Sequence, residues 1–416
     1  MHTVEAEIAM QVVFLHGWGV RDPDYGVLPD LLQEHLGAQV RDVWLSEYVS
    51  YSDSVTMADL ADAFERARRQ SIGGEPFCCV THSTGGPVVR EWLARYSNQM
   101  LTHLVMLAPP NHGTALAQLG KGKISRMAMW LGHREPGEQI LNFLELASDD
   151  SWSLNRAHLD QPPSTYLFSL IGSAIEPKFY DHLNSYTGER GSDGVVRAAA
   201  ANLNFNMVEL RQAGPSLDLK RSGRSSPEAF GILPGLSHCG TVRGILSSIT
   251  RANAASHPAA QWVERCLQVK DAAGYNQVSA GLAELNAQAQ DQTSMLAFRV
   301  RDLRGRQVTD YDLLLTAGPD YSPDALPKGF FLDRQKNRAS GGLTYYIDHK
   351  VFEQTRELGF RISARPNAGP VNYRASEFRS EEATVEAVLK PHETTYVEIT
   401  LERRLEPVVF RLRKAA

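Results

Sequence analysis

The sequence has no uninterrupted apolar run of the length that a membrane-spanning helix needs, which is about 20 residues. It also has no excess of basic residues, since 43 lysines and arginines face 48 aspartates and glutamates and give a formal net charge of −5. A nucleic-acid-binding protein usually carries a strongly basic domain or stripe. We therefore expect neither a transmembrane segment nor a nucleic-acid partner.

Cysteine is scarce as well, with four residues in a chain of 416. Cys78 and Cys79 are adjacent within an apolar run, and Cys239 and Cys266 stand far from them, so the CxxC or histidine-rich spacing of a metal site does not appear. Buried free thiols fit this pattern, because free cysteine packs as a small apolar side chain. We expect no metal ion and no organic cofactor.

The first residues, MHTVEAEIAMQVVFLHG, carry acidic residues and no basic segment ahead of their apolar run. A secretory signal peptide begins with a basic segment, so we expect this stretch to form a first core strand. With the free thiols, this predicts a cytoplasmic location. Export by a signal-independent route stays open.

The length of the chain is sufficient for two domains with separate cores. Over residues 1–270, apolar strands alternate with helical patterns over short connections, which is typical of a mostly parallel sheet with helices on both faces. Residues 271–292 are rich in alanine and glutamine and predict a helical linker. Over residues 293–416, short period-2 runs separated by Gly, Pro, Asn and Asp predict a C-terminal all-β, sandwich-like domain.

The stretch from Phe77 to Glu91, FCCVTHSTGGPVVRE, is typical of a strand, a tight turn of small residues and a helix. Ser83 stands at the apex of this turn, where its hydroxyl is presented beyond the strand end while small neighbours let strand and helix approach closely. A serine in an ordinary strand-to-helix loop gives the same local pattern. The rest of the chain must therefore supply partners if Ser83 is a nucleophile.

Two polar residues later in the chain fit those partner roles. Asp193 lies between small residues in GSDGVV, and His238 lies in the loop sequence LSHCG. A serine hydroxyl needs a neutral imidazole to take its proton, and a carboxylate fixes the imidazole tautomer and stabilises the imidazolium. The order serine, aspartate, histidine therefore predicts a catalytic triad of Ser83, Asp193 and His238.

Other acids and histidines compete for these roles. Asp193 is favoured because its small neighbours suit a turn after a strand, and His238 is favoured because it alone among the histidines considered lies on a late loop. We expect His16 and His82 to orient loops by hydrogen bonding. The remaining rivals are Asp150, Asp181 and His112.

Attack on an ester leaves negative charge on the carbonyl oxygen, which fixed N–H donors must meet. We expect the backbone amide of Thr84, at the start of the helix after Ser83, and that of Trp18, in the turn HGWG, to form this oxyanion hole. Because both donors belong to the backbone, the Thr84 side chain should matter less than the Ser83 side chain.

The strand-and-helix alternation breaks between about residues 115 and 164, where helical pieces predict a cap or lid. Within it, the segment LGKGKISRMAMWLGHR combines basic residues with large apolar ones. Such a segment suits an anionic lipid surface and a fixed cap helix equally well. We expect peripheral membrane contact through this cap or through the C-terminal domain, and the sequence indicates no particular protein partner.

The motifs HGWG, THSTGG, APPNHGT, SDGVV and GLSHCG occur in this order over roughly residues 8 to 265. The combination resembles the bacterial lipase and phospholipase branch of the α/β-hydrolase superfamily. The resemblance implies an α/β-hydrolase fold, an oxyanion hole at Trp18 and Thr84, and acid and base at Asp193 and His238. The chain departs from the family pattern at Thr81, where the elbow usually begins with glycine.

These features predict a serine hydrolase that cleaves carboxylic esters of lipids through an acyl-enzyme. A lipid ester is the expected substrate because the strand ends are apolar and the cap is amphipathic. Acyl transfer or thioester hydrolysis on the same triad is one alternative. A catalytically silent hydrolase fold used as a binding module is another.

Overall fold

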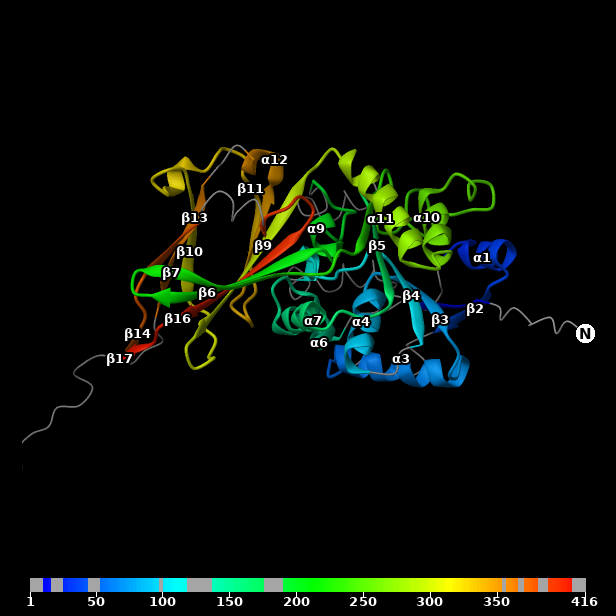
Figure 1. Ribbon diagram of the computed structural model, residues 1–416, viewed down its shortest axis with the longest axis horizontal. Coiled ribbons are helices and arrows are strands. Elements are labelled where there is room, and N and C mark those ends of the chain that lie inside the picture. Colours follow the sequence, from blue (N-terminus) through cyan, green and yellow to red (C-terminus); the bar gives the residue numbers. More distant parts are fainter. Residues whose placement is uncertain are drawn as a thin grey trace, which may run out of the picture. The chain divides into compact units, whose positions relative to one another are not determined.

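The computed structural model describes residues 10–15, 25–43, 53–96, 100–117, 137–175, 190–353, 357–365, 370–380 and 388–405 (Figure 1). The chain divides into two compact units. Unit 1 comprises Met1–Glu145, Asp149–Asn204 and Ser225–Asp291, and unit 2 comprises Leu146–Ser148, Phe205–Arg224 and Gln292–Ala416.

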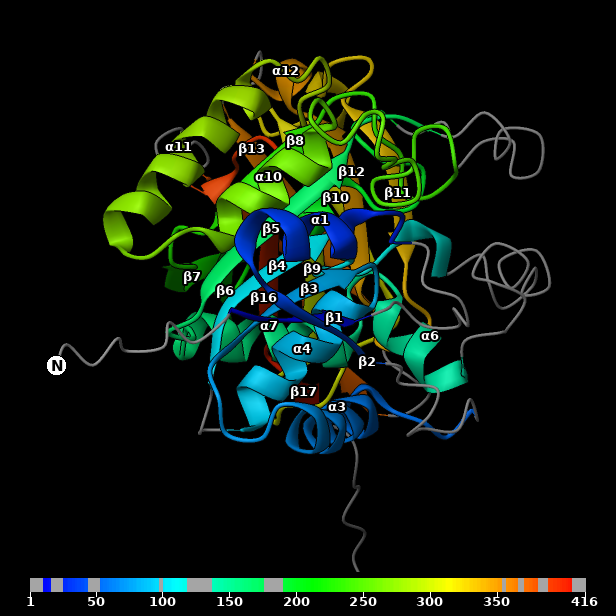
Figure 2. The same cartoon turned by 90° about the vertical axis from the view of Figure 1, so that its right-hand side faces the viewer.

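Unit 1 is built on a six-stranded parallel sheet with the order β2-β1-β3-β4-β5-β8, and helices lie on both faces of it (Figure 2). The strands are β1 (Gln11–Leu15), β2 (Gln39–Val43), β3 (Phe77–His82), β4 (Leu101–Leu107), β5 (Tyr166–Gly172) and β8 (Ala229–Leu233). The helices are α1 (Leu28–Leu36), α3 (Met57–Ser71), α4 (Gly85–Arg95), α6 (Glu138–Leu144), α7 (Asp149–Asp160), α9 (Ala198–Ala201), α10 (Pro258–Leu267) and α11 (Ala272–Ala287). The predicted α/β architecture is confirmed.

The apolar runs of the central strands supply both faces of this sheet. Val12 and Phe14 of β1 pack in a core with residues of α1, α10 and α11, while Val13 and Leu15 pack in a second core with residues of α3 and α4. Successive side chains of a strand point to opposite faces, so a strand buried on both faces must be apolar throughout. This requirement explains the apolar runs of the central strands, whereas the edge strand β2, QVRDV, is mostly exposed.

A buried carboxylate joins the helices α3 and α4, which pack on the same face of the sheet. Glu65 of α3 accepts hydrogen bonds from Arg68 Nε and Nη2, both at 2.9 Å, and from Trp92 Nε1 of α4 at 2.7 Å. Burial opposes ionisation, but the bonds from Arg68, Arg69 and Trp92 outweigh it and lower the pKa of Glu65 to about 2. The ionised carboxylate therefore holds α4 against α3.

Replacing Glu65 by glutamine is expected to lower the free energy of unfolding at pH 7 by about 2–3 kcal/mol. A carboxylate whose pKa falls on folding stabilises the native state above its ordinary pKa, and this stabilisation disappears as the pH falls from 4.5 towards 2. Urea unfolding of both proteins across this range measures the difference. Glu75→Gln, at an exposed position, is the control, and a Glu65 effect that did not shrink in acid would contradict the prediction.

Unit 2 contains a nine-stranded mixed sheet with the order β10-β13-β15-β7-β6-β16-β9-β12-β11. The strands are β6 (Phe205–Ala213), β7 (Ser216–Arg224), β9 (Thr293–Asp302), β10 (Tyr311–Ala317), β11 (Phe331–Lys336), β12 (Leu343–Asp348), β13 (Leu358–Ala364), β15 (Ser376–Arg379) and β16 (Thr394–Leu401). A short ribbon of β14 (Val371–Asn372) and β17 (Arg404–Leu405), a 3-10 turn η1 (Pro323–Ala325) and the helix α12 (His349–Phe352) complete the described elements.

The predicted all-β, sandwich-like domain is confirmed, with strand directions that the sequence pattern did not predict. The β16 strand runs parallel to both β6 and β9, so the sheet is mixed. The sheet also curls on itself. Four strands lie between β9 and β13 in the sheet order, yet the ring centroids of Phe298 on β9 and Phe360 on β13 are 5.2 Å apart. Two layers thus face each other within a single sheet.

The predicted domain boundaries need two corrections. The hairpin β6–β7, expected within a continuous domain of residues 1–270, belongs to unit 2, because an isolated hairpin is marginally stable and β6 pairs with β16 from Phe205 to Arg211. The expected linker at residues 271–292 contains α11, which packs on β8 of unit 1 through the fully buried Leu282. Of the predicted cap, α6 and α7 are described, and residues 118–136 lie outside the described residues.

Candidate active site

The turn between β3 and α4 places Ser83 in a constrained conformation. Ser83 has a φ of 53°, a left-handed value that a residue with a Cβ adopts at an energetic cost. Its N–H donates to Leu107 O at 2.9 Å, and its carbonyl accepts from Gly86 N at 3.1 Å. The predicted elbow is therefore present, with Ser83 at the carboxyl end of β3.

The close approach of α4 to β4 explains one glycine of the turn. A Cβ on Gly86 would lie 3.0 Å from Pro109 Cβ and 3.3 Å from Met106 Cγ. Thr81, in place of the usual elbow glycine, is fully buried, and its hydroxyl has no hydrogen-bond partner within the described part of the chain. The extra bulk beneath Ser83 is therefore accommodated inside the packed sheet.

The structure brings together the three residues of the predicted triad, all within unit 1. His238 Nε2 lies 3.1 Å from Ser83 Oγ, and His238 Nδ1 lies 2.9 Å from Asp193 Oδ2. The side chains of His238 and Asp193 are 4% and 0% exposed. An imidazole that donates from Nδ1 to the carboxylate has a free lone pair on Nε2, which is the tautomer that accepts a proton from a serine hydroxyl.

Backbone amides hold the carboxylate of Asp193 in this orientation. Asp193 Oδ1 accepts from Val195 N at 3.0 Å and from Val196 N at 2.8 Å, which leaves Oδ2 for His238. The positive φ of Gly194, 96°, allows the chain to turn tightly enough for both bonds. The small residues around Asp193 in the sequence thus form the cradle of its carboxylate.

The loop that carries His238 is fixed by its neighbours on both sides. His238 N donates to Asp193 O at 3.0 Å, and His82 Nε2 donates to His238 O at 3.0 Å. Gly172, at the end of β5, lies so close to Leu236 that a Cβ there would be 2.0 Å from its carbonyl oxygen. The prediction that His82 orients a loop is confirmed, and the loop is the one that carries His238.

The rival residues do not join this arrangement in the described part of the chain. His112 is buried, its Nε2 lies 2.7 Å from Asn202 O, and burial, with the charge of Arg90 adding to it, lowers its pKa to about 3. Asp150 lies in the first turn of α7, where burial and then the neighbouring Asp149 raise its pKa. The other two rivals, His16 and Asp181, lie outside the described residues.

Of the two predicted oxyanion donors, one lies in the described part of the chain. Thr84 caps the N-terminus of α4 directly after Ser83, and no described group accepts a hydrogen bond from its amide. An N-terminal helix amide points outward along the positive end of the helix dipole. Trp18 lies outside the described residues.

Three residues of the APPNHGT motif have contacts that the sequence analysis did not predict. Thr114 Oγ1 donates to Val195 O at 2.5 Å, His112 N donates to Ala200 O at 2.9 Å, and Asn111 Nδ2 donates to Ala201 O at 2.7 Å. The motif was found in the sequence, but the residues it bonds lie about 80 to 90 positions further along the chain. Only the folded chain reveals that the motif binds the loop of Asp193 at Val195 and the helix α9 that follows this loop.

Within the described ranges, no group of three or more His, Cys, Asp and Glu side chains is arranged to hold a metal ion. Nor is any helix in these ranges both long and apolar enough to cross a bilayer. The four cysteines are free thiols; Cys78, Cys79 and Cys266 are buried as predicted, and Cys239 is half-buried.

The fold and the site together define a class of protein. A parallel sheet with a serine at a strand-to-helix elbow, and an aspartate and a histidine on loops after later strands, is the arrangement of the α/β-hydrolases. The chain is a serine hydrolase of this class, of the lipase and phospholipase type.

Comparisons with known proteins narrow the class to a family. No family model and no curated protein matches the chain. Among solved structures, the phospholipase PlaB from Legionella pneumophila shares 42% sequence identity over 97% of this chain and 96% of that chain, with a TM-score of 0.91. The same phospholipase in complex with thio-NAD matches with the same identity and coverage and a TM-score of 0.89. The chain belongs to the family of this phospholipase.

Proposed function

We propose that the protein is a phospholipase that hydrolyses the carboxylic ester bonds of phospholipids, with Ser83 as nucleophile, His238 as general base and acid, and Asp193 as the orienting carboxylate. The observation that carries the proposal is the continuous chain of contacts from Asp193 Oδ2 through the His238 ring to Ser83 Oγ. The similarity to a phospholipase over nearly the whole chain supports the choice of substrate.

The reaction follows from these contacts in two halves. Ser83 Oγ attacks the ester carbonyl while His238 Nε2 takes the hydroxyl proton, and a tetrahedral intermediate forms. Its collapse breaks the bond to the glycerol oxygen, which leaves as an alcohol with the proton from His238. Water then attacks the acyl-enzyme with the same proton transfers and releases a fatty acid and free Ser83.

The backbone amides of Thr84 and Trp18 are the proposed donors to the negative oxygen of each intermediate. The Thr84 amide supports this role because it stands at the N-terminus of α4 beside Ser83. Loss of one such donor costs about 3 kcal/mol of transition-state stabilisation in other hydrolases.

Incubation with vesicles of phospholipids that differ in head group tests the proposal. We expect free fatty acid and lysophospholipid as products, because a carboxylic ester is cut. We expect little acyl ester when a short alcohol is added, because water is the acyl acceptor. Release of a phosphorylated head group would contradict the proposed bond. Hydrolysis of a soluble p-nitrophenyl ester without hydrolysis of any phospholipid would contradict the proposed substrate.

We also propose that the protein binds membranes peripherally. Large apolar side chains are exposed on unit 2, including Leu314, Phe331 and Leu405 at 54%, 43% and 56%. Such side chains gain free energy on entering the boundary between head groups and acyl chains. Sedimentation with the same vesicles should carry the protein into the pellet, and a protein that stayed in the supernatant would refute this part of the proposal.

A further inference from the structure

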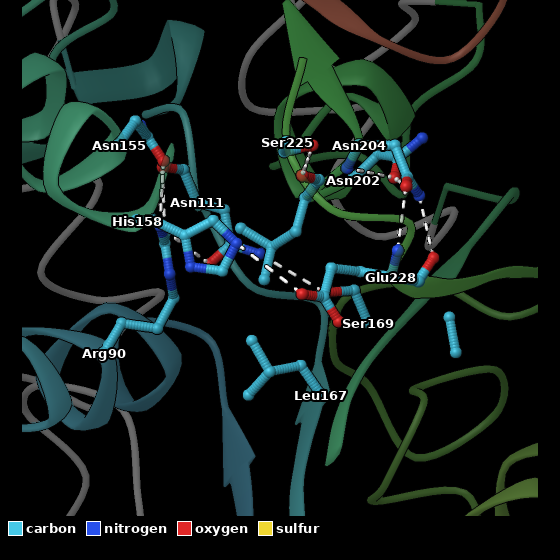
Figure 3. A network of polar contacts seen from close by, with 12 residues as sticks. Arg90, Asn111, Asn155, His158, Leu167, Ser169, Asn202, Asn204, Ser225 and Glu228 are labelled. Atoms are coloured by element: carbon cyan, nitrogen blue, oxygen red, sulfur yellow. Dashed lines mark hydrogen bonds and ion pairs between the residues drawn. The ribbon is translucent and has the colours of Figure 1, made fainter. Parts of the chain in front are cut away.

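A network of largely buried polar side chains lies in unit 1 (Figure 3). Its members come from α4, from α7, from the loop after β4 and from strand β5. The others lie just before β6 and just after β7 in the sequence. The labelled polar residues are Arg90, Asn111, Asn155, His158, Ser169, Asn202, Asn204, Ser225 and Glu228. None of them belongs to the triad.

Arg90 connects the network to the nucleophile. It lies on α4, the helix that begins after Ser83, and is only 3% exposed. Its Nη1 donates to Asn111 Oδ1 at 3.2 Å and its Nη2 donates to Asn155 Oδ1 at 2.8 Å. A buried guanidinium must keep its acceptors, because leaving a buried charge without its hydrogen bonds is strongly destabilising. The position of α4 is thus tied to Asn111.

Asn111 connects the network to the acid loop. It is 1% exposed, and its Nδ2 donates to Ala201 O at 2.7 Å at the end of α9. The start of α9 is bound to the acid loop in turn, because Ala198 N donates to Gly191 O at 2.8 Å. One amide side chain therefore accepts from the nucleophile helix and donates to the helix that follows Asp193.

Two more bonds from the same segment reinforce this connection. His112 Nε2 donates to Asn202 O at 2.7 Å, and Thr114 Oγ1 donates to Val195 O at 2.5 Å. Val195 is also the residue whose N–H binds Asp193 Oδ1. The segment Asn111–Thr114 thus holds the acid loop directly at Val195 and holds the end of α9 after it, while Arg90 holds the segment to α4.

We propose that Arg90, Asn111 and Thr114 are positioning residues that fix the distance between Ser83 and Asp193. This inference rests on the proposed function of the triad. His238 must contact Asp193 and Ser83 at the same time. A shift of the acid loop relative to the elbow therefore misaligns the imidazole. A misplacement of about 1 Å costs an enzyme about 100-fold in rate.

A matched pair of isosteric substitutions separates positioning from general stability. Asn111→Asp keeps an oxygen for Arg90 but loses the donor to Ala201 O, and places a carboxylate against that carbonyl. Asn155→Asp also keeps an oxygen for Arg90, but loses donors that reach Asn111 O and Ser151 O. Both asparagines are buried partners of Arg90, and of the two only Asn111 contacts α9.

With a soluble p-nitrophenyl ester at fixed pH, Asn111→Asp is expected to lower kcat by about 10- to 100-fold with KM changed less than about threefold. Asn155→Asp should lower kcat clearly less than Asn111→Asp does, because Asn155 contacts Arg90 and Asn111 but does not donate to Ala201 O. Equal losses of kcat in the two variants, or no loss in either, would overturn the inference. Circular dichroism and a melting curve establish that each variant is folded.

Thr114→Val decides the question if Asn111→Asp does not fold. Valine matches the shape of threonine and removes only the hydroxyl that binds Val195 O, so kcat should fall by about three- to tenfold while KM stays constant. An unchanged kcat would overturn the inference. A failure of the proposed function has a different signature, because Ser83→Ala would then retain activity in the same assay.

Discussion

Replacing Ser83 by alanine is expected to lower kcat for ester hydrolysis by at least about 10⁴-fold, because no other group forms the acyl-enzyme. Ser83 Oγ is the atom that faces His238 Nε2, at 3.1 Å. Alanine removes the hydroxyl without adding bulk to a turn that already has a φ of 53°. Initial rates on a soluble ester, which do not depend on membrane binding, measure the loss.

Ser153→Ala is the matched control for this change. Ser153 lies on an exposed face of α7, and its hydroxyl bonds to Asp149 O of its own helix. This variant should hydrolyse the ester at the wild-type rate. A Ser83→Ala protein that kept more than about a tenth of the wild-type kcat would rule out the proposed nucleophile.

Replacing Asp193 by asparagine is expected to lower kcat by about 10³- to 10⁴-fold while the fold is retained. The amide oxygen still accepts the bonds from Val195 N and Val196 N, so the loop keeps its shape. The amide nitrogen, however, is a donor where His238 Nδ1 also donates, and the imidazole is driven to the wrong tautomer. The loss therefore falls on proton transfer and leaves the architecture of the site intact.

Asp150→Asn is the control, because Asp150 is a rival acid in the sequence and lies in the first turn of α7. Its kcat should stay within about twofold of wild type, as for a substitution away from the reacting groups. A larger effect at Asp150 than at Asp193 would mean that the sequence and the contacts point to the wrong acid.

The site was predictable because parallel strands end at one edge of their sheet. Polar residues that follow β3 and β5 lie near one another whatever their separation in sequence, whereas the strand before His238, β8, was not expected from the sequence. The predicted positions of Ser83 and Asp193 follow from this rule. The departure at Thr81 did not prevent the elbow, since its side chain is buried within the sheet.

The hairpin β6–β7 was not predictable in its place, because strand pairing over long sequence distances leaves no local pattern. Its alternating residues indicate a strand in any sheet, and its partner β16 begins about 190 residues later. The curl of the unit 2 sheet was not predictable for the same reason, because it depends on which distant strands pair. Alternation predicts which face of a strand is buried, and only the pairing order decides which strands face each other.

The buried network around Arg90 was also beyond the sequence. An arginine within an amphipathic helix is read as a surface residue, since charged residues are rarely fully buried unless paired. Here the partners are amides from other elements. The roles of Trp18 and of the basic cap segment, together with the location of the protein, stay predictions.

The central claim is that Ser83 is the nucleophile of a lipid-ester hydrolase, and covalent labelling tests it most directly. A fluorophosphonate reacts with an activated serine and leaves a stable adduct that mass spectrometry assigns to one residue. We predict one adduct per chain, located on Ser83. We also predict that phospholipid hydrolysis is lost as Ser83 becomes labelled. An adduct on another serine, or hydrolysis that survives complete labelling of Ser83, would contradict the claim.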